Sequence, residues 1–172
     1  MLPILTARRA LALVCLISVG SMSAGLYVQH ELGVEPCPLC IVQRIAYVIA
    51  GAVALIGALI GTRIWLMRGL AGLSTLASIG GFGVAAWHTW LIAHPPEGAS
   101  CGRPFAWMLQ NFTLEQLLPR IFAGHGDCLT VEWTLFGLSI PQGSMLLFAA
   151  MITLGLLALA RPGQAPSMFS RA

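Results

Sequence analysis

Residues 35–61 read EPCPLCIVQRIAYVIAGAVALIGALIG, and this stretch decides the fold. From 41 to 61 the only charged residue is Arg44. A bilayer core of about 30 Å requires about 20 helical residues, so the stretch predicts a helix that spans a membrane. Similar apolar runs occupy 10–28, 69–93 and 138–160. We therefore predict an all-α membrane protein, a bundle of four transmembrane helices within a single integral membrane domain, 1–172.

The composition excludes a water-soluble protein. The chain has 172 residues, of which 58% are apolar and 9% charged, whereas soluble domains carry about 25% charged residues. The net charge of +3 is too small and too scattered to indicate nucleic-acid binding. The run 10–28 stays apolar beyond any plausible cleavage site, so we interpret it as a retained span rather than a signal peptide.

Arginine placement predicts the orientation. The N-terminal segment, the short TRIWLMR connection (62–68) and the C-terminal tail hold six of the nine basic residues and no acidic one. All six acidic residues fall in the connections at about 29–40 and 94–137: Glu31, Glu35, Glu97, Glu115, Asp127 and Glu132. Because arginine is enriched on the cytoplasmic side of membranes, both termini are expected there, and the two cysteine-bearing connections face outward.

The longer outward connection has a helical pattern of its own. Its segment 104–122, PFAWMLQNFTLEQLLPRIF, places large apolar residues at helical spacing. Such a segment beside a membrane predicts a short amphipathic helix that lies in the interface. A lid packed on the protein itself is the alternative, and the pattern does not separate the two.

The sequence CPLC places two thiols at a helix start. Pro38 suits the first helical position, where its missing N–H is no loss, so Cys37 is a candidate cap and Cys40 lies in the first turn. The positive end of the helix dipole stabilises a thiolate there. Arg44 follows one turn later, so we expect Cys37, Cys40 and Arg44 to form one stripe with the cation near the reactive sulfur. Structural disulfides and zinc sites also use CxxC, and an arginine here can simply extend to the interface.

Two further features lie towards the same side. Cys101 and Cys128 flank the amphipathic segment, and a disulfide between them is either a static link or a second redox pair capable of thiol–disulfide exchange. His88, near the outer end of the third run, is either a hydrogen-bonded structural group or, with Trp87 and Trp90, part of a pocket for a quinoid ligand.

These motifs together resemble those of the DsbB family, the bacterial inner-membrane thiol:quinone oxidoreductases. CPLCIVQR, WHTWL, Cys101, the GDC that ends at Cys128, and EWTLFGLSIPQ occur in the family's order over nearly the whole chain. The resemblance implies that Cys37 and Cys40 are the quinone-coupled pair, with the Cys40 thiolate facing the quinone.

Further roles follow from the same resemblance. Arg44 matches the quinone-binding arginine, and His88 and Trp133 match positions near the quinone ring. Cys101 and Cys128 match the periplasmic pair, in which Cys101 forms the mixed disulfide with reduced DsbA. Electrons are expected to pass from DsbA through both pairs to ubiquinone, or to menaquinone without oxygen.

The chain departs from the family pattern at two positions. Gly143 stands where the family often has tryptophan, which puts the packing beside the quinone in doubt but not the thiol chemistry. Gln43 is acidic in some relatives, and its role is left open by the sequence.

Three other interpretations compete. A vitamin K epoxide reductase-like enzyme also combines four helices, CxxC and a quinone, but its loop cysteines precede the CxxC helix. A metal-binding membrane protein would use Cys37, Cys40, His125 and Cys128, which leaves Cys101 without a role. A structural membrane protein with two static disulfides leaves Arg44 unexplained.

Overall fold

The fold is seen in a computed structural model that describes residues 6–33, 36–60, 63–94, 110–113, 115–116, 134–135 and 137–160. Its elements are α1 (Ala7–Glu31), α2 (Pro38–Ile60), α3 (Ile64–Ala93), β1 (Thr134–Leu135), β2 (Leu138–Ser139) and α6 (Ile140–Ala160). The four long helices are each long and apolar enough to cross a membrane. The predicted all-α membrane architecture with four spans is therefore confirmed.

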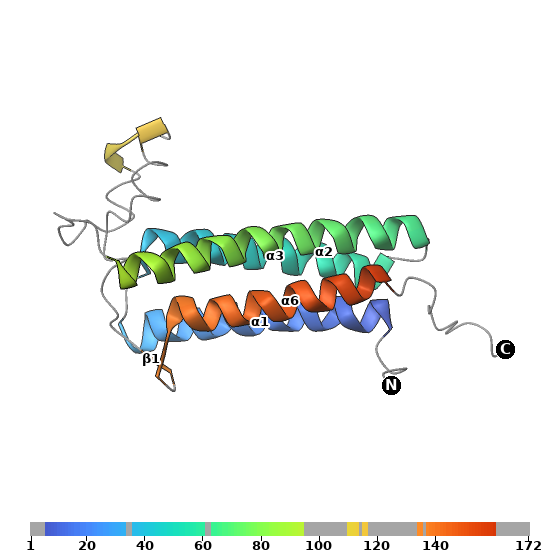
Figure 1. Cartoon of the computed structure of the whole chain (residues 1–172), viewed down its shortest axis with the longest axis horizontal. Coiled ribbons are helices and arrows are strands. Elements are labelled where there is room, and N and C mark those ends of the chain that lie inside the picture. The colour runs from blue at the N-terminus through green and yellow to red at the C-terminus, as the bar shows by residue number, and fades with distance from the viewer. Residues whose placement is uncertain are drawn as a thin grey trace.

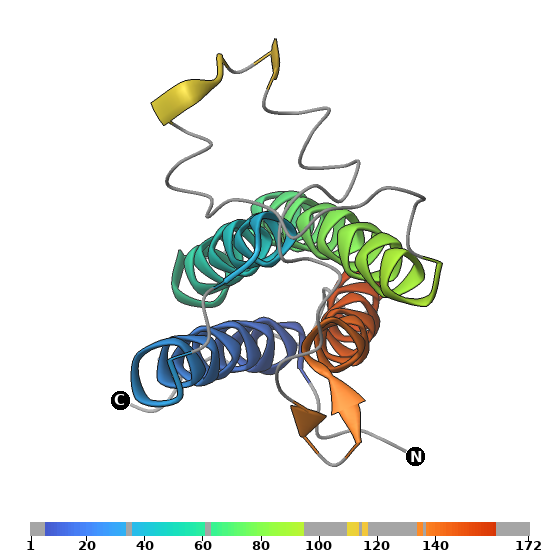
Figure 2. The ribbon, with the colours of Figure 1, turned by 90° about the vertical axis from the view of Figure 1, so that its left-hand side faces the viewer.

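The helices run alternately up and down as a closed bundle (Figure 1). Viewed from one end, α1, α2, α3 and α6 follow one another around the bundle, and α6 returns to pack on α1 (Figure 2). The start of α1 and the end of α6 lie at one end of the bundle. The start of α2 and the end of α3 lie at the opposite end, where the CPLC motif is found (Figure 1).

The start of α2 agrees with the sequence prediction, whereas the start of α3 does not. Helix α2 begins at Pro38, and its first turn is closed by a hydrogen bond from Ile41 N–H to the Cys37 carbonyl at 3.1 Å. Helix α3 already begins at Ile64, so the predicted connection 62–68 is wrong over most of its length. The physical reason is that Met67 is buried in the core, which favours continued helix up to Arg63.

Small residues allow the helices to approach closely. At Gly51 in α2 an added Cβ would lie 2.6 Å from the Cβ of Ser18 in α1, so the α2 backbone packs directly on the Ser18 side chain. At Gly81 in α3 an added Cβ would overlap the ring of Phe148 from α6. Phe148 in turn stacks on Tyr47 from α2, with ring centroids 4.0 Å apart. Through Phe148, helix α6 thus contacts both α2 and α3.

The outward surface of the bundle is apolar. Large side chains on all four helices are exposed, among them Leu16 (65%), Leu59 (68%), Trp65 (79%) and Leu146 (56%). Such a surface is stable in lipid and not in water. The chain is accordingly a multi-pass membrane protein, and the bilayer is one of its partners.

A short hairpin precedes the last helix, and the sequence analysis did not anticipate it. Strands β1 and β2 pair antiparallel, and Gly137 at the turn has φ +80°, a conformation that favours glycine. The backbone N–H of Ser139 donates to the Gln142 side-chain oxygen at 3.0 Å. Helix α6 therefore begins at Ile140, slightly inside the predicted span 138–160.

The predicted amphipathic segment 104–122 is described only in part, at 110–113 and 115–116. In that part, Phe112 packs against Cys37, Leu39 and Leu91. This contact supports a segment that covers the protein at this position, one of the two interpretations left open by the sequence.

Candidate redox site

The Cys37–Cys40 pair is formed by the start of α2. Cys37 precedes the helix and is 7% exposed, while Cys40 is half-buried in the first turn. The backbone N–H of Cys40 donates to the Cys37 sulfur at 3.2 Å, so the helix N-terminus contacts this sulfur directly. The Cys37 thiol donates to the Cys40 sulfur at 2.8 Å, and no disulfide joins them. The pair therefore lies ready for reversible oxidation with little movement of the backbone.

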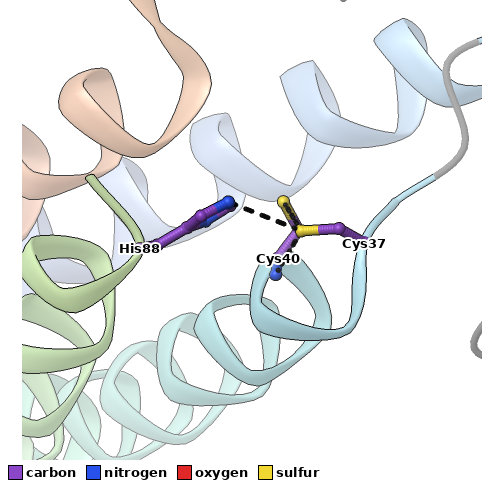
Figure 3. A group of neighbouring side chains, drawn as sticks. All are labelled: Cys37, Cys40 and His88. Carbon is purple, nitrogen blue, oxygen red and sulfur yellow. Dashed lines mark hydrogen bonds between the residues drawn. The ribbon is translucent and has the colours of Figure 1, made fainter. Parts of the chain in front are cut away.

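His88 approaches this pair from α3. Its ring is 3% exposed, and Nε2 lies 3.8 Å from the Cys37 sulfur. Figure 3 shows the imidazole directed from α3 toward both sulfurs at the start of α2. The sequence placed His88 near the outer end of its helix, but only the packing of α3 on α2 brings it to the thiols.

Gln43 holds the other side of the same ring. Its side-chain nitrogen lies 3.2 Å from His88 Nδ1, and the residue is 3% exposed. The sequence analysis noted Gln43 without giving it a function. The available signal was a polar side chain inside a membrane-spanning run, which is costly unless it is paired.

Arg44 is directed to a different neighbour. Its guanidinium donates to the Gln29 side-chain oxygen at 2.6 Å and to the Gly25 carbonyl at 2.9 Å, both from α1. A Cβ on Gly25 would lie 3.4–3.7 Å from the guanidinium atoms, which is ordinary contact, so only a side chain larger than alanine would displace the cation. We expected the cation near the reactive sulfur, but the polar contacts of Arg44 among the described residues are with α1 and not with the sulfurs. Gln29 and Gly25 are site residues that the sequence analysis missed.

The two tryptophans named with His88 stack on each other. Trp87 is 41% exposed and Trp90 49% exposed, and their rings stack with centroids 5.0 Å apart. Trp90 stacks in turn on His94 at 5.2 Å. The suggested pocket of His88 with Trp87 and Trp90 stays a prediction. Exposed aromatic residues at the end of a span are typical of the membrane–water interface.

Four residues named from the sequence, Cys101, Cys128, Trp133 and His125, lie outside the described residues. The metal site suggested from the sequence included two of these. Within the described part of the chain, Cys37, Cys40 and His88 are the group whose sulfur and nitrogen atoms lie within 4.8 Å of one another, close enough to hold a metal ion. Two thiols and an imidazole suit a soft cation such as zinc.

Comparisons with known proteins assign the chain to a family. The family model "Disulfide bond formation protein DsbB" matches residues 7–158. Disulfide bond formation protein B of Polaromonas sp. strain JS666 is 47% identical over 154 residues, covering 90% of this chain and 91% of the relative. The proteins of the same name from Azoarcus sp. strain BH72 and Paracidovorax citrulli are 44% and 41% identical, covering 78% and 96% of this chain and 81% and 94% of the relatives. The family resemblance inferred from CPLCIVQR and the later motifs is thereby confirmed: this chain belongs to the DsbB family of disulfide bond formation proteins.

Proposed function

We propose that this chain re-oxidises a DsbA-like periplasmic thiol oxidase and passes the electrons to membrane quinone, as a protein-disulfide:quinone oxidoreductase. The observation that supports this most directly is the Cys37–Cys40 pair, two thiols 2.8 Å apart at the N-terminus of a helix able to span a membrane. A thiol pair at that level is adjacent both to water, where a protein substrate approaches, and to lipid, where quinones dissolve. Family membership supplies the overall role in disulfide bond formation.

The electron route uses two cysteine pairs. The dithiol of the reduced oxidase breaks the Cys101–Cys128 disulfide through a mixed disulfide on Cys101, and the oxidase becomes a disulfide. The two thiols so formed then reduce a Cys37–Cys40 disulfide by a second exchange. Each exchange breaks one disulfide, forms one, and moves two electrons. When bound, quinone accepts two electrons and two protons as Cys37 and Cys40 rejoin as a disulfide.

Arg44 is the residue proposed to hold the quinone. Its bonds to Gln29 and Gly25 use two of the five N–H donors of a guanidinium, which leaves donors for a quinone carbonyl oxygen. The α1 contacts also fix the side chain one turn below Cys40, so it does not need to be ordered when quinone binds. His88 contacts the sulfurs directly, and Trp133 is proposed to lie near the ring on the family resemblance alone. The quinone is ubiquinone, with menaquinone as the anaerobic alternative.

The proposed location is the bacterial inner membrane, with both termini in the cytoplasm. Arg9, Arg63 and Arg68 are exposed at the end of the bundle opposite to Cys37. Because cytoplasmic ends of membrane proteins carry the arginine excess, the Cys37 end is expected to face the periplasm. That orientation presents the cysteines to a periplasmic thiol oxidase.

Two alternatives are weaker. The comparisons named above are with disulfide bond formation proteins, which gives a vitamin K epoxide reductase-like function no support. Metal binding has one favourable observation, the clustering of Cys37, Cys40 and His88. A metal held there would block the disulfide that the family role requires.

The test uses purified full-length protein in nanodiscs, a reduced DsbA-like oxidase and ubiquinone. We expect quinol to form at one equivalent per oxidase disulfide produced. A Cys101→Ser variant is expected to lose oxidase turnover while its Cys37–Cys40 dithiol still reduces quinone in a single turnover. The proposal is wrong if wild-type protein forms no quinol, and stoichiometric zinc in aerobically purified, active-site-reduced protein would favour the metal alternative.

A further inference from the structure

Gln43 has no part in the electron route, yet it is one of the most buried polar residues of α2. Its side chain is 3% exposed inside a helix that spans the membrane. A buried amide is costly unless its groups are hydrogen-bonded. Its contact is His88 Nδ1 at 3.2 Å, and the same ring lies 3.8 Å from Cys37 through Nε2. An amide, an imidazole and two thiols are therefore linked in one series.

The proton positions in this series depend on one another. The Cys37 thiol has a single proton, which it donates to the Cys40 sulfur at 2.8 Å. In the hydrogen bond between Cys37 and His88 the imidazole must therefore be the donor, so Nε2 carries the N–H. A neutral ring protonated on Nε2 has a lone pair on Nδ1. The group facing Nδ1 is the Gln43 side-chain nitrogen, which can only donate.

All three bonds thus point in one direction. The Gln43 amide donates to His88, His88 donates to Cys37, and Cys37 donates to Cys40. Successive hydrogen bonds in a medium of low dielectric polarise one another, so donation at the start of the series strengthens donation at its end. The backbone N–H of Cys40 adds a second donor to the Cys37 sulfur at 3.2 Å.

We infer that Gln43 is a positioning residue that sets the direction of this hydrogen-bond series and so places the negative charge on Cys40. The inference rests on the proposed function for its consequence, because Cys40 is the sulfur proposed to react with quinone. When the pair has lost one proton, the remaining one stays on Cys37, between the two sulfurs. His88 acts as a donor in this series and keeps its own proton.

Glutamate at position 43 would reverse the first bond. A carboxylate only accepts, so it draws a proton onto Nδ1 whether the ring is neutral or cationic. Gln142 supplies a matched control at the same end of the bundle, because its side-chain oxygen accepts from a backbone N–H, which glutamate does equally well. A comparison of Gln43→Glu with Gln142→Glu therefore separates the proposed effect from the addition of a carboxylate.

The first test reads the His88 ring directly by nitrogen NMR of full-length, reduced protein labelled with ¹⁵N-histidine near neutral pH. A His88→Asn spectrum assigns the signal. We expect Nε2 protonated and Nδ1 unprotonated in the wild type and in Gln142→Glu, and Nδ1 protonated in Gln43→Glu. A wild-type ring protonated on Nδ1 would overturn the inference.

The second test measures the Cys40 thiolate by its alkylation rate in reduced protein, with the modified site identified by mass spectrometry. Gln43→Met removes the amide at similar volume and is expected to slow Cys40 alkylation about three- to tenfold, the effect of one neutral hydrogen bond. Gln142→Met should leave the rate unchanged. Equal rates in Gln43→Met and Gln142→Met would contradict the inference. Neither test uses quinone or oxidase, so a failure of the proposed function is observed separately.

Discussion

Two neighbouring residues of α2, Gln43 and Arg44, serve two different sides of the site. Gln43 faces α3, where it meets His88 in a buried cluster that ends at the two thiols. Arg44 faces α1, where its half-buried cation is held by Gln29 and by the Gly25 carbonyl. Consecutive residues of a helix point about 100° apart, so one turn of α2 presents one side to α3 and another side to α1.

The two sides of the site are suited to different chemical functions. On the α3 side, close contacts and exclusion of water suit control of sulfur protonation. On the α1 side, a cation with spare donors suits recognition of a carbonyl oxygen. Substitutions on the α3 side are therefore expected to change thiol chemistry, and substitutions on the α1 side to change quinone affinity.

The largest expected effect removes the thiols themselves. Cys37→Ser and Cys40→Ser each leave a hydroxyl that cannot form a disulfide, so quinone reduction should fall below detection in a steady-state assay. Cys15→Ser is the control, because Cys15 lies in α1 outside the site and should leave the rate unchanged. Quinone reduction that persisted in Cys37→Ser would show that the Cys37–Cys40 pair is not the electron donor to quinone.

Arg44→Ala should raise the KM for quinone by about ten- to a hundredfold, the loss of a hydrogen bond from a charged donor. The KM for the oxidase should change much less, because that substrate is proposed to react with the other cysteine pair. Arg44→Lys keeps the charge but not the planar guanidinium, so its KM for quinone is expected to lie between those of the wild type and Arg44→Ala. If KM for both substrates rose equally, Arg44 would be an anchor for α1 and not a quinone contact.

His88→Asn tests the α3 side. It should lower kcat about three- to tenfold through loss of the bond to the Cys37 sulfur, with the KM for quinone little changed. Single-turnover rates of quinone reduction provide the measurement. A rise in the KM for quinone without a fall in kcat would mean that His88, like Arg44, contributes to quinone affinity. The α3 and α1 sides of the site would then not differ in function.

The smallest effect is expected at Gly25. Gly25→Leu should push the guanidinium of Arg44 out of place and raise the KM for quinone about threefold, within the range of a weakened hydrogen bond. Gly20→Leu, also in α1, is the control because a Cβ there meets nothing within 4 Å. Identical kinetics of the two variants would mean that α1 does not position Arg44.

The sequence was informative where local rules operate. Hydropathy located the four spans, and Pro38 correctly predicted where α2 begins, with Cys40 in the first turn. The contact of His88 with Gln43 could not be predicted, because it depends on how far α3 slides along α2. That position is set by contacts between the two helices, such as the hydrogen bond from the Ser74 hydroxyl to the Ala50 carbonyl at 2.9 Å, which no spacing within one helix reveals. The partners of Arg44 depend in the same way on α1.

The central claim is that the Cys37–Cys40 dithiol gives its electrons to quinone. Its most direct test is anaerobic addition of ubiquinone to reduced, full-length protein, followed by differential alkylation of all five cysteines and mass spectrometry. With ubiquinone in excess, both cysteine pairs give up their electrons, so we predict that Cys37 and Cys40 become protected as a disulfide while two equivalents of quinol appear, with Cys15 still a thiol. If Cys37 and Cys40 remained alkylatable after quinone addition, the account would be contradicted.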